Sequence, residues 1–87
     1  MRYTLLISRR AEREYDRLPD NIQRRINRAF DEIAESPCGP GVVKLQGGED
    51  LYRWRVGDGR IIYRVQDEAL IVLVVRIGNR REVYRGL

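Results

Sequence analysis

Arginine is the residue type in this sequence best suited to chemistry, and in the second half it recurs at short intervals. Residues 51–56 read Leu-Tyr-Arg-Trp-Arg-Val, so one residue separates Arg53 from Arg55. Four of the six arginines that follow and a late tyrosine continue this series: Arg60, Arg64, Arg80, Arg81 and Tyr84. A guanidinium group stays charged and holds phosphate oxygens with a planar fork of donors. Arginines spaced along strands therefore predict a surface that binds phosphate.

Other residue types leave few catalytic alternatives. The sequence has no histidine, which is the commonest general base and metal ligand. Cys38 is a poor candidate nucleophile without a histidine beside it. We therefore expect a site of arginine and tyrosine that needs no cofactor and no metal. Such a site can neutralise a phosphorane-like transition state, orient a ribose 2′-hydroxyl and stack on a base, which suffices for RNA cleavage by internal attack.

The length and cysteine content predict a small cytoplasmic protein. Its 87 residues fit a single domain over residues 1–87. One cysteine excludes an internal disulfide, which favours a reducing compartment. No apolar run approaches the ~20 residues of a membrane span, and no hydrophobic signal region follows the first residues. We therefore expect a cytoplasmic location and no contact with a membrane.

The basic charge is carried almost entirely by arginine and is concentrated in the second half. Lys44 is the one lysine among 17 basic residues. Residues 1–43 hold eight arginines and seven acidic residues, whereas residues 44–87 hold eight arginines and Lys44 against six acidic residues. A formal net charge of +4 favours a polyanionic partner such as nucleic acid.

The first half predicts a strand followed by two helices. Residues 3–7 read as a strand, and Ser8 is a suitable cap for a helix. Pro19 ends that helix, and Asp20 can cap a second one, with Gln23 placed to reach back to the cap. An apolar stripe follows at helical spacing: Ile22, Ile26, Ala29, Phe30, Ile33 and Ala34. The arginines off this stripe are interpreted as a solvated helix face rather than as RNA contacts: Arg24, Arg25 and Arg28.

The second half predicts an antiparallel meander after a loop and a glycine turn. The expected loop, turn and strands are 36–41, 47–50, 51–56, 60–66 and 70–77. If Arg55 pairs with Arg60, then Trp54 faces Ile61, and the tyrosines of the two strands also meet on that apolar side. A shift by one residue would mix charge into the core. In the favoured register Arg53 joins the other two arginines on the opposite face, either to bind an anion or to extend into water.

From Tyr3 to Tyr84 the sequence resembles the RelE-type toxins of the RelE/ParE superfamily. The likeness includes the Leu-Pro junction at 18–19, the Ser-Pro turn at 36–37 and the Lys-Leu-Gln-Gly run at 44–47. Its most specific part is the series tyrosine-basic-x-basic, a glycine-rich turn, arginine-x-x-tyrosine, Gly-x-Arg and Glu-Val-Tyr. The resemblance implies an α+β fold, similar to microbial ribonucleases, in which an N-terminal strand and a helical hairpin pack on a mainly antiparallel sheet completed by a C-terminal β-meander.

The resemblance also implies roles for individual residues. In RelE-type enzymes two basic residues of the first meander strand line the active site, and their counterparts here are Arg53 and Arg55. By the same likeness, Arg60 and Arg80 would hold the scissile phosphate, and Tyr84 would stack on or orient the nucleotide. Further RNA contacts are assigned to Lys44, Arg64 and Arg81. The first-strand pair departs from the lysines of well-known members, and arginine is a poor general base because it almost never loses its proton.

The resemblance implies a toxin of a type II toxin–antitoxin system. Such a toxin would cleave messenger RNA in the ribosomal A site by attack of the 2′-hydroxyl, and a RelB-like antitoxin would silence it. Operator DNA would be bound only by the toxin–antitoxin complex. Two alternatives keep the same fold: a ParE-like inhibitor of DNA gyrase, and an inactive module that only binds a partner or regulates its operon.

Overall fold

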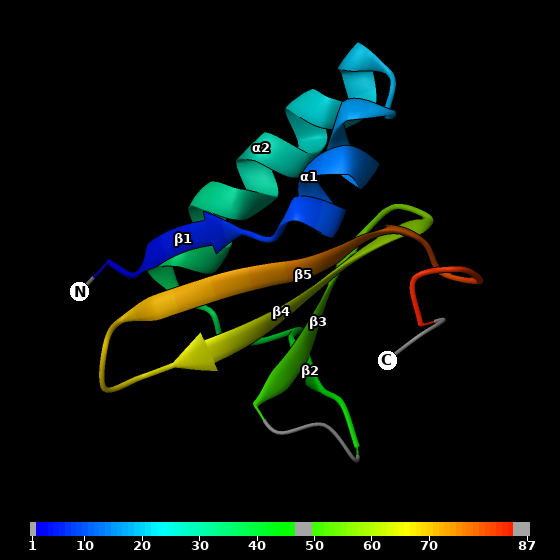
Figure 1. Ribbon diagram of the computed structural model, residues 1–87. Coiled ribbons are helices and arrows are strands. Elements are labelled where there is room, and N and C mark those ends of the chain that lie inside the picture. The colour runs from blue at the N-terminus through cyan, green and yellow to red at the C-terminus, as the bar shows by residue number, and fades with distance from the viewer. Residues whose placement is uncertain (1, 47–49, 85–87) are drawn as a thin grey trace.

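The computed structural model describes residues 2–46 and 50–84, and residues 47–49 of the predicted glycine turn lie outside this part. The described chain forms two helices and five strands: β1 (Thr4–Ile7), α1 (Arg9–Asp16), α2 (Asp20–Glu35), β2 (Val43–Lys44), β3 (Leu51–Val56), β4 (Gly59–Gln66) and β5 (Ile71–Asn79). Figure 1 shows both helices above one face of the sheet, while the segment 80–84, which carries the buried Val83, lies on the other side. The predicted α+β class is confirmed.

The strands form one mainly antiparallel sheet in the order β1-β5-β4-β3-β2. Only β1 and β5 run parallel, and the helices lie in the connection that follows β1. The predicted register between β3 and β4 is confirmed, because Arg55 pairs with Arg60 and Trp54 pairs with Ile61. Pairing also extends to Val56 and Gly59, so β4 begins one residue earlier than predicted and only two residues form the turn between these strands.

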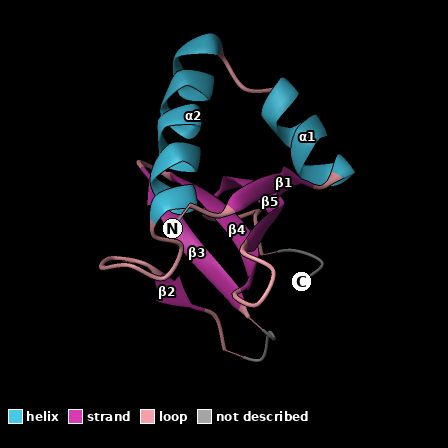
Figure 2. Ribbon diagram, turned by 90° about the vertical axis from the view of Figure 1, so that its left-hand side faces the viewer, coloured by secondary structure: helices cyan, strands magenta, loops and turns pink. Residues whose placement is uncertain are grey.

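The two helices form the predicted hairpin, but the second one begins differently from the prediction. The Ser8 hydroxyl caps α1 by accepting the N–H of Ala11 at 3.1 Å. Asp20 is the first residue of α2 and not its cap, because the extended Pro19 precedes the helix and its carbonyl accepts the first helical N–H groups. Gln23 therefore has no cap to reach, and its amide donates to the Tyr15 carbonyl at 2.9 Å. Figure 2 shows the two helices above the sheet, joined by a short connection at the end farther from it.

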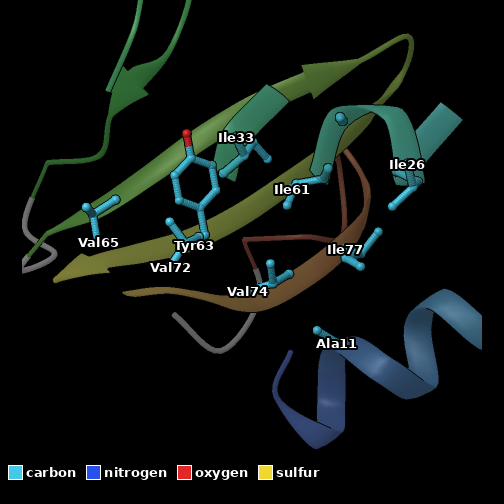
Figure 3. Close-up of a cluster of buried hydrophobic side chains, with 10 residues drawn as sticks. Ala11, Ile26, Ile33, Ile61, Tyr63, Val65, Val72, Val74 and Ile77 are labelled. Carbon is cyan, nitrogen blue, oxygen red and sulfur yellow. The ribbon is translucent and has the colours of Figure 1, made fainter. Parts of the chain in front are cut away.

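The main core lies between the helices and one face of the sheet. Ala11 of α1 and the buried side of α2 pack against apolar residues of β4 and β5 (Figure 3). The α2 stripe is buried at Ile26, Ala29, Ile33 and Ala34, whereas Ile22 and Phe30 are half-buried at its margin. Neither helix of the described chain is long and apolar enough to cross a membrane. Because the core occupies this face of β3 and β4, the arginines of these strands lie on the opposite face.

A β-bulge controls the direction of the side chains near the end of β5. The pairing of β4 with β5 shifts between Ile62 and Tyr63, so that Ile62 opposes Arg76 while Tyr63 opposes Val74. The extra residue reverses the alternation along β5. Ile77 consequently joins the helix-side core, while Gly78 lies opposite Arg60. The strand also continues to Asn79, two residues beyond its predicted end.

Candidate functional site

The turn between β3 and β4 gathers the first part of the candidate site. Gly57 adopts φ +57°, a left-handed conformation that glycine accepts without the strain of a side chain. Its carbonyl oxygen accepts Nε of Arg55 at 3.2 Å and Nη1 of Arg60 at 3.1 Å. Arg60 Nη1 also donates to the Gly59 carbonyl at 2.8 Å. Backbone carbonyls therefore hold two paired, like-charged side chains near one point and partly offset their repulsion.

Arg80 reaches the same turn from the end of β5. Its backbone N–H donates to the Asp58 carbonyl at 3.1 Å, which ties the segment after β5 to the β3–β4 turn. The Arg80 side chain is exposed. Arg81 follows it, also exposed, and its N–H bonds to the Asn79 side chain at 2.9 Å. Three predicted site arginines thus converge on one turn although 25 positions separate the first from the last.

Arg53 and Tyr84 form a second part of the site on the same face. Nη1 of Arg53 donates to the Tyr84 hydroxyl at 3.1 Å. Val83 is fully buried against Leu51 and Ile62, and Tyr84 packs against the edge of this small cluster. Because alternate residues of a strand share a face, Arg53 lies about 7 Å along β3 from its neighbouring site arginine. A cation, a phenol and a flat apolar surface therefore lie beside the turn.

A buried ion pair holds the segment that carries Tyr84, and the sequence alone did not reveal it. Arg76 has a side chain only 7% exposed, and its Nε lies 3.0 Å from Oε2 of Glu14 on α1. The other oxygen of Glu14 accepts the Ile77 N–H at 2.9 Å. Arg76 also donates to the Glu82 carbonyl at 3.2 Å. One guanidinium thus links α1, β5 and the C-terminal turn, and its only sequence signal is a charge inside an apolar strand.

Replacing Glu14 by alanine is expected to destabilise the protein by about 3 kcal/mol, because the change leaves a buried cation without its carboxylate. The free energy of unfolding in urea measures the effect. Glu12→Ala is the matched control, since Glu12 is an exposed carboxylate on the same helix and its loss is expected to change stability by less than about 0.5 kcal/mol. Equal stability of the two variants would contradict a structural role for the pair.

The structure separates two of the predicted RNA contacts from the turn. Lys44 pairs with Tyr52, so its side chain belongs to the helix side of the sheet, opposite Arg53. Arg64 shares the face of Arg60 but lies four residues along β4, roughly 13 Å away. Both side chains are exposed. The site residues that the structure brings together are Arg53, Arg55, Arg60, Arg80 and Tyr84.

Two tyrosines with raised pKa values lie on the helix side of the sheet. A hydrogen bond to the Cys38 sulfur, with some burial, raises the pKa of Tyr52 to about 12. Burial raises the pKa of Tyr63, whose hydroxyl donates to the Pro37 carbonyl at 2.7 Å. The two rings stack with centroids 6.0 Å apart. At neutral pH these phenols stay protonated, so they act in packing and hydrogen bonding.

The arrangement on the other face suits recognition of a phosphodiester. Guanidinium donors from three strand ends can surround phosphate oxygens, and the charge is already in place before a reaction begins. A tyrosine ring supplies a surface on which a base can stack. The site therefore combines several arginines and one tyrosine ring on a single sheet face.

Comparison with known families supports this description. Residues 5–84 match the family model of the ParE toxin of type II toxin–antitoxin systems, parDE. The sequence is 32% identical to the mRNA interferase toxin RelE of Escherichia coli strain K12 over 88 residues, with 97% of this chain and 92% of that protein covered. The chain therefore belongs to the RelE/ParE family of type II toxins and is a RelE-type member.

Solved structures show the same relationship. The intact RelBE toxin–antitoxin complex of E. coli matches with a TM-score of 0.78 and 29% identity, covering 88% of this chain and 95% of that one. The archaeal RelE–RelB complex of Pyrococcus horikoshii OT3 matches with a TM-score of 0.81 and 29% identity, covering 94% and 99%. The predicted fold and the predicted membership in the RelE-type toxins are both confirmed.

Proposed function

We propose that this toxin is an endoribonuclease that cuts messenger RNA in the ribosomal A site without a metal ion. The observation that carries the proposal is the meeting of Arg55, Arg60 and Arg80 at one turn, with the Arg53–Tyr84 contact beside it. The relative named an mRNA interferase supports the same activity. The reaction needs no metal ion because the arginines supply the positive charge that a metal ion would otherwise provide.

In the proposed reaction the RNA supplies its own nucleophile. The 2′-oxygen forms a bond to phosphorus while the bond from phosphorus to the 5′-oxygen breaks. The 2′-hydroxyl loses its proton and the leaving 5′-oxygen gains one, which leaves a 2′,3′-cyclic phosphate and a 5′-hydroxyl. Arg60 and Arg80 hold the non-bridging oxygens and stabilise the extra charge of the transition state. Tyr84 stacks on or orients the nucleotide, with its hydroxyl fixed by Arg53.

The test of the proposed function is cleavage of a defined message on purified ribosomes, run beside a DNA gyrase supercoiling assay. The matched family model carries the ParE description, so inhibition of gyrase is the competing activity. We expect cleavage at the A-site codon and no effect on supercoiling. Inhibition of gyrase without cleavage would assign the ParE-like activity, and loss of both activities would leave a binding module.

We propose that a RelB-like antitoxin silences this toxin by covering the arginine face. The matched structures of E. coli and P. horikoshii are complexes of RelE with RelB, which supports a partner of that kind. An acidic segment of the antitoxin would pair with Arg53, Arg55 and Arg60 or displace the turn that carries Tyr84. Binding of operator DNA is assigned to the complex, since the free toxin uses this face for RNA.

Antitoxin binding is expected to weaken as salt is added, because exposed charge pairs are screened within about 8 Å at physiological ionic strength. Titration calorimetry between ~0.05 and 0.5 M salt measures the change. An Arg55→Ala variant should show a shallower salt dependence than the wild type. Affinity that does not change with salt would instead indicate an apolar groove as the main interface.

A further inference from the structure

Arg25 of α2 lies over the β3–β4 turn and adds a cation that the sequence assigned to a solvated helix face. A methyl group placed on Gly57 would lie 3.0 Å from Nη2 and 3.3 Å from Nη1 of Arg25. The carbonyl of the same glycine holds Arg55 and Arg60. Within residues 2–46 and 50–84, the exposed Arg25 side chain makes no hydrogen bond or ion pair. Its charge is therefore available to a ligand at the edge of the site.

Next to Arg25 the structure contains a hollow of about 280 Å³ between the helical hairpin and the end of the sheet. Leu18 and Ile22 form its helical wall, and Val56 and Ile77 form its floor. Gly59 also lines the floor and leaves space because it has no side chain. The hollow is near the lower end of the ~300–1,000 Å³ range of ligand pockets. Its size and apolar walls suit one flat ring.

Polar groups at the rim of the hollow connect it to the arginine site. Arg25 and Arg60 both line it, so the hollow shares one residue with the arginines proposed to hold the scissile phosphate. Asp58 and Asn79 line it too, and a carboxylate or an amide can pair with the edge of a base. The Asn79 side-chain oxygen already accepts an N–H from Arg81, which leaves its amide N–H groups to donate.

We propose that this hollow, the Arg25 subsite, binds the nucleotide next to the scissile phosphate. Arg25 contacts a phosphate of that nucleotide, and the base enters between the helical wall and the sheet floor. The inference rests on the proposed RNA cleavage and adds a second nucleotide to it. RNA fits better than an acidic peptide because the subsite combines one cation at its edge with an apolar slot sized for a ring and polar groups that face the ring edge.

Salt dependence of RNA binding tests the phosphate contact. The probe is a labelled single-stranded RNA that carries 2′-deoxyribose at the scissile nucleotide, bound to the free protein and measured by fluorescence anisotropy. Arg25→Ala should weaken binding about fourfold at physiological salt and lower the slope of log affinity against log salt by about 0.7. Arg24→Ala is the matched control. Arg24 is also exposed, and its side chain projects about 100° from that of Arg25 round the helix axis, away from the turn.

An abasic scan of the same RNA tests the base contact. Removal of the base that enters the hollow should weaken wild-type binding about tenfold, within the range for loss of one base contact. Ile22→Phe fills the hollow, so this variant should bind the intact RNA about tenfold more weakly and show no further loss at the abasic position. Circular dichroism melting checks that Ile22→Phe is folded, and Arg25→Ala tests the subsite without any change in packing.

The outcomes separate this inference from the proposed function. If the wild type cuts messages on ribosomes but Arg25→Ala and Arg24→Ala bind RNA equally well, the Arg25 subsite is wrong and the proposed function stands. If the wild type neither cuts nor binds RNA, both fail. If Arg25→Ala or Ile22→Phe weakens only the antitoxin complex, the hollow belongs to the antitoxin and the nucleotide assignment is overturned.

Discussion

Arg80→Ala is expected to lower message cleavage about 100- to 1,000-fold, the usual cost of removing one donor that stabilises transition-state charge. Cells that express this variant without an antitoxin should keep growing. The physical reason is that the backbone N–H of Arg80 is fixed to the turn by its hydrogen bond to Asp58. The Arg80 side chain is exposed and makes no hydrogen bond or ion pair within residues 2–46 and 50–84. The rate of cleavage on ribosomes and the growth of induced cultures measure the two effects.

Stability measurements show whether the lost activity of Arg80→Ala comes from the missing guanidinium or from unfolding. Because the Arg80 side chain is exposed, the alanine variant should unfold within about 0.5 kcal/mol of the wild type in urea. Arg10→Ala, an exposed change on α1 far along the chain from the turn, should retain activity. Full toxicity of Arg80→Ala, or a melted circular dichroism spectrum, would remove Arg80 from the proposed site.

The register of the meander could be predicted because two independent patterns agreed. Pairing Trp54 with Ile61 keeps apolar residues on one face, and the same pairing places Arg55 opposite Arg60. A shift by one residue would bury an arginine charge, and the free-energy cost of that burial far exceeds the differences in strand propensity between residues. Strand periodicity alone is therefore enough to predict which arginines share a face.

Contacts that depend on an irregular backbone could not be predicted. The β-bulge opposite Ile62 and Tyr63 has no clear sequence signal, yet it decides that Arg76 pairs with Ile62 and not with Ile61 of the helix-side core. The start of α2 was predicted one residue late because Asp20 is a good cap by type, whereas the structure uses the carbonyl of Pro19. In both cases a local preference was overruled by the neighbouring backbone.

Contacts between side chains of different elements also could not be predicted from the strand pattern. Arg25 belongs to a helix face that looks solvated in sequence, and only the packing of the hairpin on the sheet carries it over Gly57. Lys44 shows the opposite case: it lies close to Arg53 in the pairing of β2 with β3, but the pleat directs it to the other face. The residue type gives the charge of each side chain, but only the packing of the elements determines which groups surround it.

Replacing the 2′-hydroxyl of the scissile nucleotide by hydrogen should abolish cleavage entirely. In the proposed reaction that oxygen is the nucleophile, held beside phosphorus within one molecule, and no arginine can activate a water in its place. A synthetic message with a single 2′-deoxynucleotide, bound in the A site of purified ribosomes, provides the substrate. The uncut message should persist at the level seen without the toxin.

The controls for this experiment concern position and product ends. A message with the 2′-deoxynucleotide one position away should be cut normally, since only the scissile residue supplies the nucleophile. The unmodified message should yield a 2′,3′-cyclic phosphate, or the 3′-phosphate derived from it, together with a 5′-hydroxyl. A metal-activated water would instead leave a 3′-hydroxyl and a 5′-phosphate. Efficient cutting of the deoxy substrate would overturn the arginine-face mechanism while leaving the RelE-type family assignment intact.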